Sequence, residues 1–479
     1  LAILATTARS VSPDEFSHVE AARYYLDRWL PAKVGDPATL ASYSAYGTSY
    51  LNEMDVVYLL AAKFARALAF TGLDDVVRLR LFNVSLLALC VLLALRSRAG
   101  RIAVLPLLCT PQAWYVFGYF NADAVGLAAS ILLGTAVITW LERAAMHPRL
   151  LHAGGWRWAL AFGVLLALCL LSKRTFYPFL PFITAYALWR VGYRTRSTYA
   201  LGVLGLFVLA IWFYARPPFE SVPSLIASSG ARVATLASAG FLLAAAGWMT
   251  YRDYEPQRRF PGALALAAVV AVALVALRVG ADFAVNGLPG EKAHALSLLA
   301  ERIARPDFRP SVLGTHSSYF GIALAGRGVS LAELLFGQYA WVSTMSASFF
   351  GIYGYMSILA TAWTYKLQYA FAVLLLATIG TACYRSSRMV LALGVACIAL
   401  TLELTVLHSW VLDLQPQGRY AFAILPIVAV LWFEARVRGE AGDRIGIGLN
   451  GLAYGALVVL WAVALFSFAF IGLPGVAHS

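Results

Sequence analysis

The chain has 479 residues, of which 61% are hydrophobic and only 13% are charged, and its mean hydropathy is +0.73. These values exclude a soluble domain and predict an all-α polytopic membrane protein. The formal net charge of +13 does not indicate a nucleic-acid partner. The arginines stand in small clusters between apolar runs, which is typical of the cytoplasmic loops of membrane proteins.

The apolar runs predict about twelve transmembrane helices, or thirteen if a truncated one precedes Arg9. Only eight apolar or small residues stand before Arg9, too few to cross a bilayer, and no cleavable signal segment is visible. The other predicted spans cover residues 81–95, 102–118, 124–141, 158–172, 177–190, 200–214, 233–250, 261–279, 367–384, 389–407, 420–434 and 446–473.

The arginine clusters predict the orientation of these spans. They fall in alternate loops, and the positive-inside rule assigns all of them to the cytoplasm. The clusters are Arg96, Arg98 and Arg101; Arg143, Arg149 and Arg157; Arg190, Arg194 and Arg196; Arg252, Arg258 and Arg259; Arg385 and Arg388; and Arg436, Arg438 and Arg444. Three regions are then predicted on the extracytoplasmic side: residues 10–78, the turn at 119–123 and the long loop at 280–350.

The first external region starts with a helix signal. Ser12 is followed by Pro13 and, three positions after Ser12, by Glu15, which is typical of a helix that is closed by a capping box. We therefore expect a helix from this point to Leu30, with Glu15 satisfying its N-terminus.

The same motif supplies the candidate catalytic residues Asp14, Glu15 and His18. Charges so close to an apolar segment are costly and usually functional. If Glu15 caps the helix, Asp14 is left to act as a base, and His18 lies one turn further along, where it can orient Asp14 or touch a substrate. The structural alternative is that both acids only complement the helix dipole.

Two amphipathic stretches within residues 10–78 predict helices that lie in the membrane interface. In the first, Val19, Ala22, Leu26, Trp29 and Leu30 repeat at helical spacing opposite charged residues. The second covers residues 54–70 and carries Lys63 and Arg66.

Polar residues also stand at two later external span ends. Asn121 and Asp123 flank one turn, where a loop cap is the alternative explanation. The adjacent cations Lys173 and Arg174, followed by Tyr177, break the positive-inside pattern. Binding of an anionic phosphate explains them, and snorkelling from a span end is the alternative.

Gln417, Arg419 and Tyr420 form a comparable group before a late span. Arg419 follows Gly418, a glycine that lets a ligand approach the backbone closely, although an interface anchor is the alternative. An aromatic and glycine-rich segment at 348–355 stands at the same level. It is expected to be an aromatic belt at the membrane surface or the wall of a sugar or lipid groove.

Nothing in the sequence divides the chain, so residues 1–479 are predicted to form one transmembrane domain. The five cysteines are odd in number and far apart, so neither a disulfide framework nor a zinc site is expected. From position alone, the loop at 280–350 is expected to shape the side that an acceptor occupies, with His294, His316, Tyr319 and Arg327.

Together these motifs resemble those of the GT-C superfamily of integral membrane glycosyltransferases, which use polyprenyl-phosphate-linked sugars. The order, sidedness and spacing of the motifs carry the resemblance, which covers nearly the whole chain and is closest to bacterial members. The motifs are Pro-Asp-Glu-x-x-His from Pro13 to His18, Asn-x-Asp from Asn121 to Asp123, Ser-Lys at Ser172 and Lys173, and Gln-Gly-Arg-Tyr from Gln417 to Tyr420.

The resemblance implies two interfacial helices in the first loop and an inverting transfer on the extracytoplasmic side of a bacterial inner membrane. The implied partners are membrane lipids, a polyprenyl-phosphate sugar donor and a glycan, lipid or protein acceptor. By position, Asp14 would be the base, and Lys173, Arg174 and Arg419 would hold the donor phosphate.

Two points limit the resemblance. Some relatives bind a divalent metal through paired acidic motifs, whereas the second motif here offers Asn121 and Asp123, so no cofactor is assigned and a metal is not favoured. A transporter or flippase of polyprenyl-linked lipids is the alternative function. It predicts ionisable residues near the bilayer midplane and paired halves of the sequence, and neither is evident. Glu403 is the one clear intramembrane acid, and a buried structural partner such as His408, or a span end placed a few residues away, explains it at least as well.

Overall fold

The computed structural model describes residues 12–146, 156–192, 262–313, 324–439 and 444–478, together with a few isolated positions between 199 and 242. Within these ranges the chain is almost entirely helical. The sheet found there is a small antiparallel hairpin of β1 (Ile352–Tyr353) and β2 (Ile358–Leu359). The prediction of an all-α polytopic protein is confirmed.

Seven helices of the described ranges are long and apolar enough to cross a membrane. Each of them covers one of the predicted spans, and they identify a multi-pass membrane protein. They are α4 (Asp75–Arg96), α7 (Asp123–Met146), α12 (Gly262–Asn286), α17 (Ala362–Ser386), α18 (Arg388–Val411), α19 (Ile424–Gly439) with the turn before it, and α20 (Arg444–Ser467) with the residues after it.

Two predicted spans form shorter apolar helices. These are α8 (Trp156–Leu170), of 15 residues, and α9 (Phe179–Arg190), of 12 residues. The predicted spans at 200–214 and 233–250 and the truncated span before Arg9 lie outside the continuously described residues, so the total of twelve to thirteen stays a prediction.

The run at 102–118 was predicted as one span but is divided into three pieces. They are α5 (Arg98–Val104), a 3-10 turn at Leu105–Cys109 and α6 (Pro111–Gly118). Pro106 and Pro111 explain the division, because proline lacks the N–H donor that a continuous helix requires.

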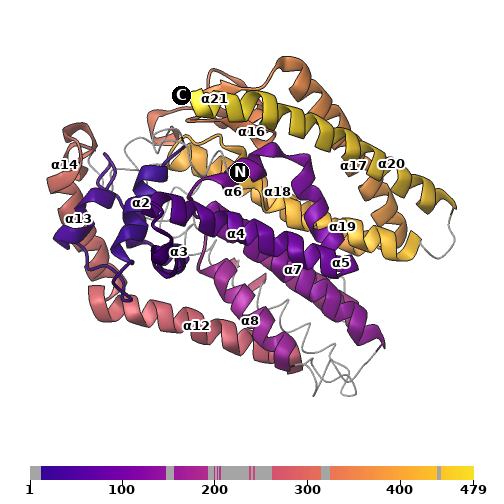
Figure 1. The fold of residues 1–479 in the computed structure, drawn as a ribbon, viewed down its shortest axis with the longest axis horizontal. Coiled ribbons are helices and arrows are strands. Elements are labelled where there is room, and N and C mark those ends of the chain that lie inside the picture. Colours follow the sequence, from indigo (N-terminus) through magenta and orange to yellow (C-terminus); the bar gives the residue numbers. More distant parts are fainter. Residues whose placement is uncertain are drawn as a thin grey trace.

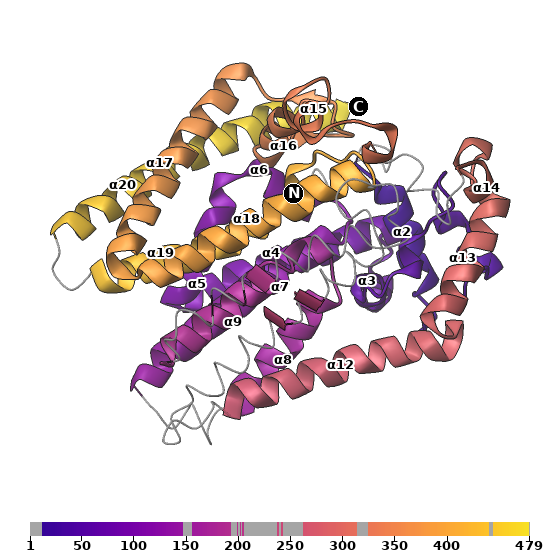
Figure 2. The ribbon, with the colours of Figure 1, turned by 180° about the vertical axis from the view of Figure 1, so that it is seen from behind.

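The helices form a bundle with two different ends (Figure 1). One end, on the left in Figure 1 and on the right in Figure 2, gathers α2 (Glu15–Tyr24), α3 (Val57–Ala67), α13 (Pro289–Ile303) and α14 (Pro310–Leu313). The opposite end holds the C-termini of α7 and α19 and the N-terminus of α20, which carry predicted cytoplasmic arginines. The acidic motif at the start of α2 and these arginines therefore lie at opposite ends of the bundle.

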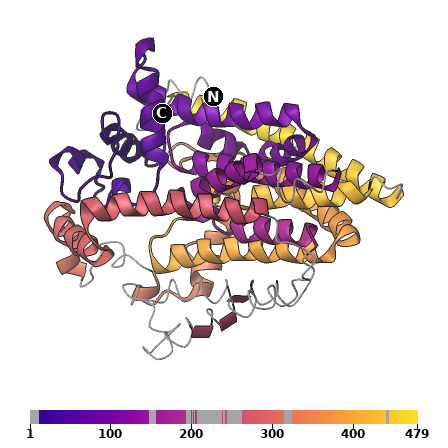
Figure 3. The same cartoon turned by 90° about the horizontal axis from the view of Figure 1, so that it is seen from below.

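Helix α12 runs along the outside of the bundle (Figure 3). Only 17% of the apolar stretch of α12 is buried inside the protein, and its main contact is with α8. Gly163 makes this contact close, because a Cβ atom there would lie 2.5 Å from the Cβ of Val270. The remaining surface of α12 is apolar, as expected of a helix that faces lipid.

The two predicted helices of the first external region are present as α2 and α3, and they pack against each other. Buried small side chains, among them Ala22 and Ala61, make the contact. The ammonium of Lys63 binds the carbonyl oxygens of Tyr25 and Leu26 at 2.7 and 3.2 Å. A cation at this position satisfies carbonyls that a helix C-terminus leaves free, and α2 ends here rather than at the expected Leu30.

Helix α13 joins the first external region to the loop at 280–350. A Cβ atom on Gly47, whose φ is 72°, would lie 2.9 Å from the Cα of Ala300, so glycine permits the close approach. A buried ion pair between Lys292 and Asp282, at 2.9 Å, fixes α13 on α12. Asn286 of α12 completes the connection by accepting a hydrogen bond from the Val34 N–H at 2.9 Å.

Candidate functional site

Asp14 lies at the start of α2 with a left-handed backbone, φ 58°. Its side chain makes no capping hydrogen bond. Oδ2 lies 3.3 Å from Nη2 of Arg419, and Oδ1 accepts a hydrogen bond from the hydroxyl of Tyr355 at 3.3 Å. The side chain is 37% exposed, so a bound molecule can reach the carboxylate. A strained backbone of this kind is often found at functional sites.

Arg419 connects Asp14 with the start of α7. Its guanidinium is 4% exposed; Nη1 donates to the hydroxyl of Tyr119 at 2.9 Å, and Nε lies 3.6 Å from Oδ2 of Asp123. Tyr420 lies under the guanidinium, with its ring centroid at 5.3 Å. Within the described part of the chain, Nε of Arg419 and Oδ1 of Asp123 have no hydrogen-bond partner. Such buried polar atoms are costly unless a ligand satisfies them.

Gly418 places Arg419 inside the protein. The 3-10 turn η11 (Gly418–Ala421) lies so close to the end of α16 (Trp341–Phe349) that a Cβ atom on Gly418 would be 2.0 Å from the backbone nitrogen of Phe349. The Gly418 N–H donates to Oγ of Ser348 at 3.0 Å. We expected Gly418 to let a ligand approach closely, but the backbone of Phe349 takes that place. Gln417, just before the turn, is half-buried.

Glu15 has a different role from the one expected. It is fully buried and forms an ion pair with Arg80 of α4, with Nε and Nη2 at 2.7 and 2.6 Å from its two carboxylate oxygens. The Phe120 N–H donates to the same carboxylate at 2.7 Å. The capping-box prediction is wrong, because Glu15 turns into the core towards Arg80. We therefore assign Glu15 to holding α2 on α4 rather than to catalysis.

His18 is buried and does not contact the carboxylate of Asp14. Nδ1 lies 2.8 Å from the hydroxyl of Tyr58, and the ring stacks on Tyr50 with centroids 4.1 Å apart. Burial, followed by the charges of Lys173 and Arg419, lowers the pKa of His18 well below its ordinary value. The neutral ring therefore supports the site as a packing group. Lys173 and Arg419 also lie close together, because the 3-10 turn after Lys173, Arg174–Phe176, contacts the turn Gly418–Ala421.

Lys173 follows α8 and points at the first external region. Its Nζ lies 4.8 Å from the centroid of Tyr50. No ion pair or hydrogen bond of this ammonium is found among the described residues. Burial lowers the pKa of Lys173, but Tyr50 and the charges of Asp123 and Glu53 outweigh burial and raise it above its ordinary value. The next residue, Arg174, is exposed. Tyr177 fixes the turn, because its hydroxyl donates to the Leu170 carbonyl at 2.7 Å.

Asn121 and Asp123 differ in what they contact, although both are buried. The side chain of Asn121 accepts a hydrogen bond from the Ala124 N–H at 3.1 Å and donates to the carbonyl of Val116 at 2.6 Å. Asn121 therefore caps α7, which was the structural alternative for this motif. Asp123 faces Arg419 and belongs to the charged site.

A further acid, Asp55, was not predicted as a site residue. It lies just before α3, where the Val56 N–H donates to the carbonyl of Leu171 at 2.9 Å and so brings the segment to the end of α8. Burial, followed by the charge of Glu53, raises the pKa of Asp55 to about 7 against the opposing effect of Lys173. The signal in the sequence was a pair of acids directly before an amphipathic helix.

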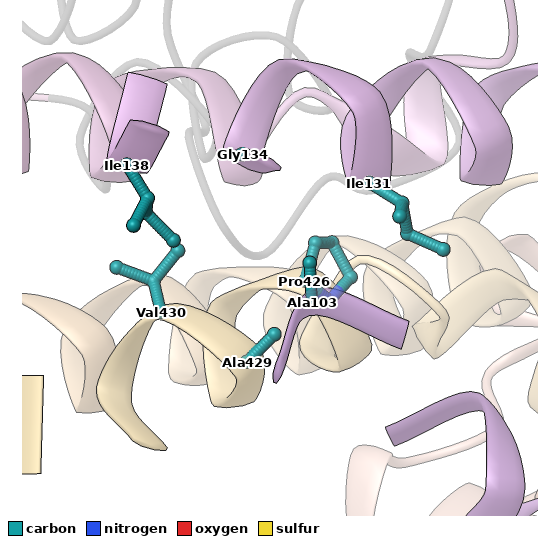
Figure 4. A pocket seen from close by; sticks show the side chains of 7 residues that line it. All are labelled: Ala103, Ile131, Gly134, Ile138, Pro426, Ala429 and Val430. Carbon is teal, nitrogen blue, oxygen red and sulfur yellow. The ribbon is translucent and has the colours of Figure 1, made fainter. Parts of the chain in front are cut away.

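Two other features bear on ligand binding. Among the described residues, no group of three or more histidine, cysteine, aspartate or glutamate side chains is placed to hold a metal ion. A shallow recess between α5, α7 and α19 has essentially no room for a water molecule (Figure 4). Its lining is apolar, so it offers no group for acid or base chemistry: Ala103, Ile131, Gly134, Ile138, Pro426, Ala429 and Val430.

Comparison with known proteins adds no assignment: no family model, curated protein or solved structure matches the chain. The argument for function therefore depends on the geometry of the charged site. This site consists of Asp14, Asp55, Asp123, Lys173 and Arg419, and it lies at the end of the bundle opposite the arginine-rich ends.

Proposed function

We propose that the chain is a membrane glycosyltransferase of the GT-C type. It transfers a sugar from a polyprenyl-phosphate donor to a glycan, lipid or protein acceptor on the extracytoplasmic side of a bacterial inner membrane. The observation that carries the proposal is the pairing of a part-exposed carboxylate, Asp14, with Arg419 at 3.3 Å. Lys173, whose ammonium makes no ion pair among the described residues, lies beside the turn that carries Arg419.

The arrangement supports an inverting displacement. The acceptor hydroxyl attacks the anomeric carbon of the donor while its proton passes to Oδ1 of Asp14. The bond between the anomeric carbon and the phosphate oxygen breaks, and polyprenyl phosphate leaves with the bonding electrons. A base is needed on one side of the sugar and a cation on the other, because negative charge develops on the leaving phosphate.

Buried Arg419 and half-buried Lys173 have different roles in the proposed reaction. Arg419 already contacts Asp14 and Tyr119, and its Nε faces Asp123 at 3.6 Å, so it positions the base. Lys173 is the better phosphate ligand, because its ammonium makes no ion pair or hydrogen bond within the described residues, whereas Arg419 already binds Asp14. Arg174 is exposed and can reach the outer part of a lipid head group.

Substitution of Asp14 by asparagine tests the base. The full chain in lipid nanodiscs is incubated with candidate polyprenyl-phosphate sugars and acceptors, and released polyprenyl phosphate is detected by mass spectrometry. Asp14→Asn is expected to abolish transfer while donor binding persists, because the amide cannot accept the acceptor's proton. Turnover equal to that of the wild type would remove Asp14 from the mechanism.

Substitution of Lys173 by methionine tests the phosphate site. The change keeps most of the aliphatic side chain and removes the charge, so the KM for the donor is expected to rise at least tenfold. Lys33→Met is the matched control, because Lys33 is an exposed lysine of the same external region. Equal donor KM values in the two variants would contradict the phosphate role of Lys173.

Lipid transport is the second candidate, and one observation favours it. Glu403 lies within α18, and its Oε2 is buried without a hydrogen-bond partner in the described residues. The expected partner, His408, instead lies beside Tyr420, with ring centroids 6.2 Å apart. An intramembrane acid of this kind is typical of transporters. Loss of lipid translocation in Glu403→Gln, with sugar transfer absent from the wild type, would favour transport.

A further inference from the structure

Tyr355 contacts the very oxygen that has to receive the proton in the proposed reaction. It lies in the turn between β1 and β2, and its hydroxyl donates to Oδ1 of Asp14 at 3.3 Å. The Asp14 N–H in turn points at the same hydroxyl at 3.4 Å. A phenol hydroxyl on a carboxylate has the same donor chemistry as an alcohol that is about to lose its proton.

The base of the hairpin is fixed. The hydroxyl of Tyr353, in β1, lies 2.9 Å from Oγ of Ser467, and the Tyr353 side chain is fully buried. The hydroxyl of Tyr365 donates to the carbonyl of Gly351 at 2.8 Å. The hairpin is thus tied to α20 and to α17 at its base.

The tip of the hairpin is held by longer contacts: the Tyr115 hydroxyl donates to the Gly354 carbonyl at 3.5 Å, and Oγ of Ser348 lies 3.8 Å from Sδ of Met356. Tyr355 is 59% exposed, so its ring is not buried in a packed core. Gly354 and Met356, on either side of it, have φ values of 59° and 61°. Asp14 and Met356 are two of the three non-glycine residues with positive φ in the described chain. Left-handed conformations at non-glycine residues are strained and are often found in segments that switch between two arrangements.

We propose that Tyr355 occupies the place of the acceptor hydroxyl on Asp14 and has to be displaced by the acceptor. This inference rests on the proposed glycosyltransferase function and adds a specificity-determining residue to it. The acceptor class that it selects is an alcohol, such as a sugar hydroxyl, that can donate a hydrogen bond to Asp14 in place of the phenol.

The contact also protects the donor from water. Without an acceptor, a water molecule at Oδ1 of Asp14 could lose a proton to the carboxylate and attack the anomeric carbon. The products of that side reaction are the free sugar and polyprenyl phosphate. A tyrosine hydroxyl on Oδ1 excludes this water until an acceptor arrives, and exclusion of water from a reactive site is a recognised way to prevent hydrolysis.

The test is Tyr355→Phe in the full chain, which removes the hydroxyl and retains the ring. The acceptor KM is expected to fall about three- to tenfold, because the hydrogen bond from Tyr355 to the charged carboxylate of Asp14 no longer competes with the acceptor. Donor hydrolysis without acceptor is expected to rise severalfold. The control is Tyr384→Phe, at a half-exposed tyrosine near the C-terminus of α17 that lies beside Arg388, where neither value should change.

Two results would overturn the inference in an active enzyme. One is an unchanged acceptor KM together with unchanged donor hydrolysis in Tyr355→Phe. The other is a raised KM, which would make Tyr355 a group that binds the acceptor. If the wild type transfers no sugar from any donor, the proposed function fails instead.

Hydrogen exchange tests the contact without any activity. Asp14→Ala and Tyr355→Phe are each expected to speed amide exchange at residues 354–357 relative to the wild type and to Tyr384→Phe. Unchanged exchange in both variants would show that Asp14 does not hold the tip of the hairpin.

Discussion

Replacement of Glu15 by glutamine tests whether a buried ion pair holds helix α2 on the rest of the bundle. Glu15 and Arg80 are 0% and 1% exposed, and two nitrogens of the guanidinium lie 2.6 and 2.7 Å from the carboxylate oxygens. Glutamine keeps the shape of the side chain but leaves the Arg80 charge without its counter-charge. Breaking such a pair typically costs about 3–5 kcal/mol. We expect about 3 kcal/mol, because Arg80 has further interactions.

The assay is denaturant unfolding of the full chain in detergent micelles, followed by tryptophan fluorescence. Glu20→Gln is the matched control, since Glu20 lies on the same helix and pairs with Arg23 at 2.5 Å, but with side chains 13% and 30% exposed. A partly exposed pair of this kind contributes about 0–1 kcal/mol. Removal of both buried charges in Glu15→Gln with Arg80→Met should restore much of the loss. Equal losses in Glu15→Gln and Glu20→Gln would refute the reasoning.

Gly418→Ala is expected to lower the thermal unfolding temperature, because its Cβ atom would lie 2.0 Å from the backbone nitrogen of Phe349. Gly451→Ala in α20 is the control, since nothing lies within 4 Å of a Cβ atom there; matching melting curves would contradict the packing role. Asp55 has a pKa raised from 3.8 to about 7, mainly by burial, so its stabilising contribution is present below about pH 4 and lost as the pH rises through 7. Between pH 4 and pH 7 the melting temperature of the wild type should therefore decline more than that of Asp55→Asn. Parallel plots of melting temperature against pH for the two proteins would disprove the raised pKa of Asp55.

The membrane spans were predictable because lipid imposes a simple length requirement. A helix must keep about twenty apolar residues in hydrocarbon to satisfy its backbone, and α4, α7, α12 and α17 to α20 meet this requirement in the sequence itself. The run at 102–118 shows the limit of hydropathy. Its composition matches a span, but Pro106 and Pro111 divide the backbone into α5, a 3-10 turn and α6.

The contacts of the site were less predictable, because they join residues that lie far apart in the sequence. Local spacing predicted that Glu15 caps its own helix, whereas Arg80, 65 residues further on, takes its carboxylate into the core. His18 likewise binds Tyr58, 40 residues away, instead of orienting Asp14. A capping hydrogen bond at an exposed helix end is a weaker interaction than a buried pair of opposite charges with matched geometry.

Asp14 and Glu15 have different roles because they differ in how many further hydrogen bonds they can accept. A carboxylate offers about four acceptor positions. Glu15 uses three of them for Nε and Nη2 of Arg80 and for the Phe120 N–H, and it has no exposed surface. Asp14 accepts two longer contacts, both at 3.3 Å, and is 37% exposed. A bound molecule can therefore contact Asp14 without disrupting the core, whereas Glu15 is fully used in holding the helix that carries Asp14 on α4.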